Sequence, residues 1–121
     1  MAFSCSVWAE WEQVSVGSSA TTYADPATMK REGNRRRIWI VRDLNKIEYL
    51  MSSPDKGFLS IQNLMEIDCK EDKLRSLQLT FFRLGMANGE AILSFPVEDG
   101  NWSYIAPNTV DRGVLEYACS R

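Results

Sequence analysis

Five basic residues fall within eight positions of the chain, on either side of the turn signal Glu32-Gly33-Asn34. Guanidinium groups bind sulfate, phosphate and carboxylate groups through paired hydrogen bonds, so this cluster predicts a site for a polyanion or an acidic extracellular protein. The alternative is a solvated hairpin tip that protects a sheet edge from aggregation. The candidate binding residues are Lys30, Arg31, Arg35, Arg36 and Arg37. Because side chains alternate along a strand, Arg35 and Arg37 share a face if a strand begins at Arg35.

Glu66 and Asp68 are the carboxylates best placed for acid–base chemistry. Two positions apart on a predicted strand, they would lie on one face about 7 Å apart, a separation that suits a two-carboxylate glycosidase. The alternatives are a solvated strand edge and pairing with arginine. The chain has no histidine, which removes the commonest general base. We therefore predict a protein that is not an enzyme, with a carboxylate-based periplasmic hydrolase as the alternative.

The sequence also contains a formal Ser-x-x-Lys motif, at Ser53 to Lys56. In penicillin-recognising enzymes this serine opens a helix and acts with further conserved motifs that are missing from the sequence. Pro54 and Gly57 indicate a surface loop instead. We interpret the match as chance.

Three cysteines, Cys5, Cys69 and Cys119, need an explanation. Their spacing contains no Cys-x-x-Cys pair and no Cys/His finger pattern, so the sequence predicts neither a structural metal site nor a cofactor. Two interpretations remain open from the residues alone: buried free thiols or a disulfide.

The composition indicates one folded domain. A chain of 121 residues with 45% hydrophobic and 25% charged residues has the profile of an ordinary globular domain. Its net charge of -2 argues against a nucleic-acid partner. No apolar run approaches the roughly 18 residues that a transmembrane helix needs, so no transmembrane segment is predicted.

The first nine residues, 1–9, are uncharged and end in Val7-Trp8-Ala9. This ending is typical of a signal-peptide cleavage site, so we expect a signal remnant or a disordered N-terminus, with the folded domain at residues 10–121. An ordinary first strand is the alternative. Cleavage after Ala9 would remove Cys5 and leave an even pair of cysteines, as an oxidising compartment favours.

The elements that must position these residues are mainly strands. Short-period patterning predicts strands at residues 11–16, 35–44, 59–69, 77–81, 91–95 and 102–105, with the second of these central, and loops at 17–22 and 45–57. Trp11, Trp39 and Trp102 should fill the core or cover the sheet.

After Pro107 the pattern changes to helical spacing, and either Asn108 or Thr109 can cap a helix that runs to Cys119. The fold class predicted is α+β, mainly β: an antiparallel sheet of about five or six strands packed with one C-terminal helix.

The order of several of these residues resembles the surface-adhesin protein E family, over positions 11 to 119. The matching residues are Trp11, Tyr23-Ala24-Asp25-Pro26, Ile38-Trp39, Glu66-Ile67-Asp68-Cys69, Gly89, Trp102, Pro107-Asn108-Thr109 and Cys119. The resemblance implies a secreted, non-enzymatic domain of Gram-negative bacteria, in which a disulfide between Cys69 and Cys119 ties the helix to the sheet. Cys5 is left without a partner.

The same resemblance implies a place in the periplasm or at the outer-membrane surface. It implies an envelope or surface binding module, with adhesion to host or matrix macromolecules as its role. The oligomeric state expected is a monomer or a homodimer.

Overall fold

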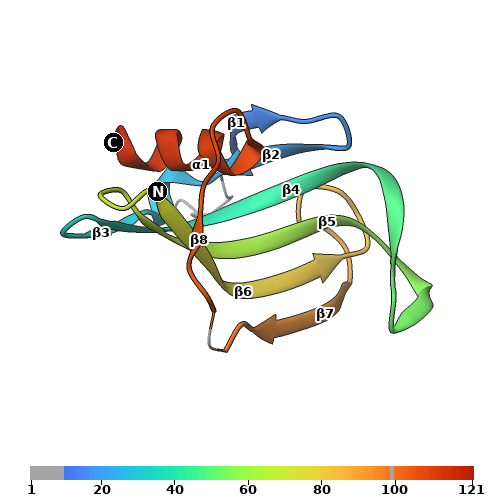
Figure 1. Cartoon of the computed structure of the whole chain (residues 1–121). Coiled ribbons are helices and arrows are strands. Elements are labelled where there is room, and N and C mark those ends of the chain that lie inside the picture. Colours follow the sequence, from blue (N-terminus) through green and yellow to red (C-terminus); the bar gives the residue numbers. More distant parts are fainter. Residues whose placement is uncertain (1–9, 99) are drawn as a thin grey trace, which may run out of the picture.

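The computed structural model describes residues 10–98 and 100–121, and the predicted signal remnant lies outside this part. The described chain forms one antiparallel sheet and a C-terminal helix (Figure 1). The six strands of the main path lie in the order β1-β2-β4-β5-β6-β7, while β3 pairs with β4 and β8 pairs with β6. The predicted fold class is confirmed. The strands are β1 (Glu12–Val16), β2 (Ala20–Ala24), β3 (Lys30–Glu32), β4 (Arg35–Leu50), β5 (Ser53–Asp68), β6 (Lys73–Phe82), β7 (Ala91–Pro96) and β8 (Ser103–Tyr104).

The longest strands, β4 and β5, are paired over most of their 16 residues each. The prediction of a loop at residues 45–57 is therefore wrong, since both strands continue through that segment and turn at Met51 and Ser52. The loop predicted at residues 17–22 is wrong in its second half, because β2 begins at Ala20 and pairs with β4. The strand at residues 35–44 is central, as predicted.

The helix α1 (Val110–Cys119) begins as the sequence predicts. Thr109 is its N-cap, and its hydroxyl accepts a hydrogen bond from the Arg112 backbone nitrogen at 3.2 Å. In Figure 1, α1 lies along β1 and β2, whereas β5, β6 and β7 extend away from it. A Cβ on Gly113 would stand 3.2 Å from the Val14 carbonyl oxygen, so glycine permits the close approach of α1 to β1.

The main core lies between α1 and the middle of the sheet. Burial of a large aliphatic side chain contributes about 1.5–3 kcal/mol, so the clustered residues supply most of the force that holds the helix down. Its buried members include Ile38, Ile40, Met65 and Ile67 from the sheet and Val114, Leu115 and Ala118 from the helix.

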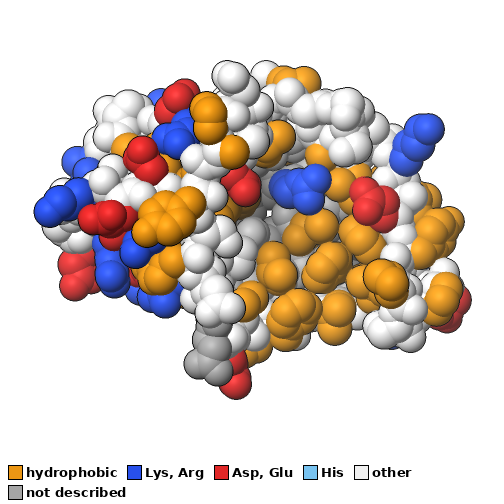
Figure 2. Space-filling view, in the orientation of Figure 1, with side chains coloured by type: hydrophobic (Ala, Val, Ile, Leu, Met, Phe, Trp, Pro, Cys, Tyr) orange, Lys and Arg blue, Asp and Glu red, His pale blue; other side chains and the backbone are white. Residues whose placement is uncertain are grey.

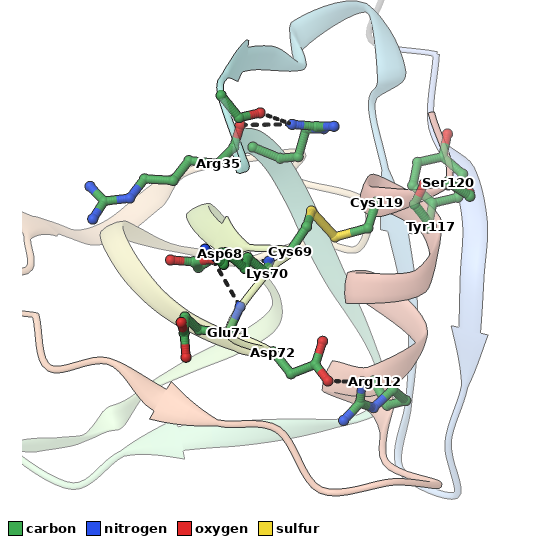
Figure 3. Close-up of a disulfide and its surroundings, with 12 residues drawn as sticks. Arg35, Asp68, Cys69, Lys70, Glu71, Asp72, Arg112, Tyr117, Cys119 and Ser120 are labelled. Atoms are coloured by element: carbon green, nitrogen blue, oxygen red, sulfur yellow. Dashed lines mark hydrogen bonds and ion pairs between the residues drawn. A yellow bond between two sulfur atoms is a disulfide. The ribbon is translucent and has the colours of Figure 1, made fainter.

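A disulfide joins Cys69, which follows β5, to Cys119 at the end of α1 (Figure 3). The two α-carbons are 5.7 Å apart, within the range that a disulfide requires. The pairing implied by the family resemblance is confirmed. The Cys69 backbone nitrogen also donates to the Asn34 carbonyl at 2.9 Å, which ties the covalent link to the turn between β3 and β4.

Candidate polyanion-binding face

The five basic residues of the cluster lie on a short hairpin, formed by β3 and the start of β4. Gly33 has a φ of +59°, a left-handed conformation that glycine adopts without strain, and it closes the turn. In the register, Lys30 lies opposite Arg37, Arg31 opposite Arg36 and Glu32 opposite Arg35.

Directly opposed residues share a face of a sheet, so the hairpin divides the cluster in two. Lys30, Arg35 and Arg37 lie on one face, and Arg31 and Arg36 lie on the other. The expectation that Arg35 and Arg37 share a face is confirmed. Arg36 is turned back on its own hairpin, where it donates to the Gly33 carbonyl at 2.9 Å.

The same register carries the face with Arg35 and Arg37 across the next two strands. Arg37 lies opposite Glu66, which lies opposite Arg75, and Arg35 lies opposite Asp68, which lies opposite Lys73. We call this surface the basic face. It contains five cations and three carboxylates and so carries a net charge of +2, although the whole chain has a net charge of -2. The cations are Lys30, Arg35, Arg37, Lys73 and Arg75, and the carboxylates are Glu32, Glu66 and Asp68.

Glu66 is the anchor of the basic face. Its side chain is 7% exposed, and it accepts hydrogen bonds from Arg75 at 2.6 and 2.9 Å and from Arg37 at 3.3 Å. Burial alone would raise the pKa of Glu66, but the hydrogen bonds and charges of Arg75 and Arg37 outweigh burial and hold the pKa below its ordinary value. The ionised carboxylate therefore clamps β4, β5 and β6 together.

The structure shows structural roles for both Glu66 and Asp68. The general acid of a glycosidase must stay protonated near neutral pH, which requires a raised pKa, whereas the pKa of Glu66 is lowered. Asp68 accepts hydrogen bonds from the backbone nitrogens of Lys70 and Glu71, both at 3.0 Å, and so holds the turn between β5 and β6. Pairing with arginine, one of the alternatives for this pair, is what the structure shows for Glu66.

Trp102 covers the part of the basic face nearest β6. Its ring centroid lies 4.5 Å from the Arg75 guanidinium carbon, and 5.2 Å from both the Arg35 guanidinium carbon and the Lys73 ammonium. Each such contact contributes about 0.5–1 kcal/mol at an exposed site. One indole ring therefore holds three cations from two strands near one another, as predicted for a tryptophan that covers the sheet.

Three cations of the face have no carboxylate partner among the described residues. No Asp or Glu oxygen of residues 10–98 and 100–121 lies within 4.0 Å of the Lys30, Arg35 or Lys73 charge. An open hollow of about 500 Å³ lies beside Arg35. Its charged lining is balanced, with four basic residues, Arg35, Arg37, Lys70 and Arg75, and four acidic ones, Glu32, Glu66, Asp68 and Glu71. Figure 2 shows charged side chains of both signs gathered at the β3 end of the molecule.

Sequence reasoning missed Lys73, Arg75 and Trp102 as members of the basic face. Lys73 and Arg75 lie outside the predicted strands at residues 59–69 and 77–81, and the observed register places them opposite Asp68 and Glu66. Trp102 belongs to the predicted strand at residues 102–105, but that pattern does not indicate a partner strand; the structure pairs β8, which follows Trp102, with β6.

Within the part of the chain that the structure describes, no three His, Cys, Asp or Glu residues are grouped so that they could hold a metal ion. The described portion also contains no helix of the length and apolar character required to cross a membrane.

The comparisons with known proteins agree with this architecture. The family model described as surface-adhesin protein E matches residues 11–120. No curated protein sequence matched the chain. A solved structure of Haemophilus influenzae protein E is similar with a TM-score of 0.68 and 14% identity, covering 99% of this chain and 91% of that one. Protein E from non-typeable Haemophilus influenzae gives a TM-score of 0.66 at 15% identity, covering 99% and 82%. These structural similarities establish a shared fold.

Proposed function

Because the chain belongs to the surface-adhesin protein E family, we propose that it is an exported, non-enzymatic adhesin that binds acidic macromolecules through its basic face. The observation that supports this most directly is the strand register, which gathers Lys30, Arg35 and Arg37 on one side of the sheet. We place the protein in the cell envelope, in the periplasm or at the outer-membrane surface, as expected for a surface adhesin.

The chemistry of the face favours a polymer that carries sulfate, phosphate or carboxylate groups at short intervals. Neighbouring strands are about 4.8 Å apart. An extended polyanion that runs from β3 to β6 meets cations on β3, β4 and β6, and between β4 and β6 it passes the carboxylates of Glu66 and Asp68 on β5. The charges of Lys30, Arg35 and Lys73 are available to such a ligand, while Arg37 and Arg75 are partly neutralised by Glu66. A local site on an acidic protein acts at short range, so binding must weaken as salt is added.

The proposal is tested with immobilised heparin as the polyanion. We expect the purified domain to bind and to be released as salt rises. The double substitution Arg35→Gln with Arg37→Gln should weaken binding by about tenfold or more, because it removes two guanidinium groups that can make charge-assisted contacts.

The matched control is Arg31→Gln with Arg36→Gln, which removes the same charge from the other face of the same hairpin. This variant should bind nearly as the unmodified domain does, provided that its melting temperature shows it to be folded. Equal loss of binding in both variants, or salt-independent binding, would contradict the proposal.

A further inference from the structure

The helix side of the sheet continues beyond α1 as an apolar surface. In one cross-strand row Arg42 lies opposite Ile61, Ile61 opposite Phe81, and Phe81 opposite Leu93. In the neighbouring row the buried Ile40 lies opposite Asn63, Asn63 opposite Leu79, and Leu79 opposite Phe95. We call the apolar part of these rows the open apolar face; its residues are Ile61, Leu79, Phe81, Leu93 and Phe95.

The outer strand of this surface is exposed, whereas Ile61, Leu79 and Phe81 are half-buried, and Ile61 and Phe81 also pack against a second buried cluster. Leu93 and Phe95 are each 37% exposed, while the Phe81 ring stacks on Phe95 with centroids 6.4 Å apart and meets Phe58 edge-on at 4.9 Å. Figure 2 shows a broad group of hydrophobic side chains over β5, β6 and β7, beside the helix. Contiguous apolar patches of this kind on a folded domain mark sites of interaction.

The form of the patch favours a macromolecule over a small ligand. A small apolar ligand needs a concave site that encloses most of its surface, whereas this patch is an open sheet face with large side chains at its outer strand. Such a surface can be buried by a partner whose apolar stripe is as long as the face.

The protein itself shows which element fits this sheet. The amphipathic helix α1 covers the other half of the same side, and it packs there through Val114, Leu115 and Ala118. The main core takes Met65 and Ile67 of β5 and Leu74 of β6, so the open apolar face lies on other parts of these strands and on β7. A helix is about 10 Å across and the face spans three strands about 4.8 Å apart, so one further helix fits on it. Figure 1 shows α1 confined to the β1 and β2 side of the sheet.

Arg42 favours acidic residues along the border of a helix that binds to this face. It is exposed at the border between α1 and the open apolar face, and no carboxylate of residues 10–98 and 100–121 lies within 4.0 Å of its guanidinium. A hollow of about 340 Å³ beside Arg42 is also lined by Asp111, in the first turn of α1. On β5 Arg42 lies opposite Ile61 of the open apolar face, so a carboxylate at the border of a partner on this face would lie near Arg42.

We infer that the open apolar face docks an amphipathic helix of a partner protein, whose apolar stripe lies across β5 to β7 and whose acidic border faces Arg42. This site lies on the side of the sheet opposite the basic face, so the two can be occupied together. The partner differs in chemistry from the polyanion of the proposed function.

The test uses a fluorescent synthetic helix of about 15 residues, long enough to cross three strands, with leucines at helical spacing and glutamates along one border. Binding is followed by fluorescence anisotropy. We expect micromolar affinity, a loss of at least about tenfold with Leu93→Asp or Phe95→Asp, and no binding of a scrambled peptide of the same composition.

A control and a charge exchange sharpen the test. Tyr104→Asp, at an exposed residue opposite Lys73 on the other side of the sheet, should leave affinity unchanged. Arg42→Glu should weaken binding of the glutamate-bordered helix and strengthen binding of a helix bordered by lysines.

Three outcomes would overturn the inference. The first is equal affinity of the unmodified domain and the Phe95→Asp variant for the peptide. The second is binding of a fatty acid in place of the peptide. The third is a domain that binds no peptide but forms dimers that Phe95→Asp dissociates, which would make the face an interface between two copies of this chain.

Discussion

At the scale of single residues, Glu66 shows how one buried carboxylate organises a surface. Moving an isolated carboxylate out of water is costly, and the cost is recovered where cations and hydrogen bonds surround it. Here Arg37 and Arg75 reach it from the strands on either side. Arg75 in turn lies over Trp102, so the anchor also fixes the aromatic ring of the basic face.

The first prediction concerns stability against pH. The pKa of Glu66 is lower in the folded than in the unfolded chain, so its ion pairs stabilise the fold above the unfolded pKa of about 4.3, and this contribution is lost as pH falls through the folded pKa. Glu66→Gln should lower the free energy of unfolding at pH 7 by about 1–3 kcal/mol, because charged hydrogen bonds are removed.

The measurement is urea unfolding at pH values from about 3 to about 7, a range that includes the titration of carboxylates. The unmodified domain should lose more stability than the glutamine variant as the solution is acidified. Parallel curves for the two proteins would show that Glu66 is not the titrating group.

At the scale of elements, strong local signals predicted the structure well. The helix was identified from its Thr109 or Asn108 cap and its apolar spacing, and the β3–β4 turn from Glu32-Gly33-Asn34. These signals work because they depend on neighbours in sequence.

The strands that were missed depend on distant neighbours. Residues 45–57 are mostly exposed, so neither face of β4 and β5 is buried there. The short apolar alternation of Ile47, Tyr49 and Met51 is itself exposed, and it is followed by the loop-like residues Ser52, Ser53 and Pro54. The residues from Ala20 to Thr22 look loop-like because they are small or polar, yet Ala20 and Thr22 are buried and pair with the long strand β4. Pairing partners, which the local pattern does not contain, decide both cases.

Only part of the basic face was predicted, for the same reason. The five clustered residues are adjacent in sequence, but Lys73 and Arg75 join them through the register of β5 and β6. Trp102 joins them because β8, which follows it, pairs with β6, and the local pattern of residues 102–105 does not contain that pairing.

The next prediction concerns how the disulfide stabilises the fold and the helix. Cys69 and Cys119 are 50 residues apart, and closing a loop of that length stabilises a fold by about 4 kcal/mol on the chain-entropy model. Replacing both by alanine should lower the melting temperature strongly, while the apolar contacts of Val114, Leu115 and Ala118 still favour helix docking.

Amide hydrogen exchange distinguishes the helix from the sheet. In the double variant, amides of α1 should lose protection before those of β4 and β5. Uniform loss of protection across helix and sheet would contradict a local role for the disulfide.

At the scale of the whole molecule, the sheet separates two surfaces of different chemistry. The side away from α1 carries the basic face, and the side that α1 half covers carries the open apolar face. The chain crosses between them after β7, since Trp102 lies among the cations and Ile105 packs in the main core. The helix, the disulfide and the Glu66 clamp keep both surfaces in place.

The most direct test of the basic face is nuclear magnetic resonance of the labelled domain during titration with a short heparin oligosaccharide. Arginine side-chain signals report each guanidinium separately, and the Trp102 indole signal is assigned with a Trp102→Phe variant. We predict that the signals of Arg35, Arg37, Arg75 and Trp102 shift together and that those of Arg31 and Arg36 stay in place. Shifts centred on Arg31 and Arg36, or spread evenly over all arginines, would contradict the account.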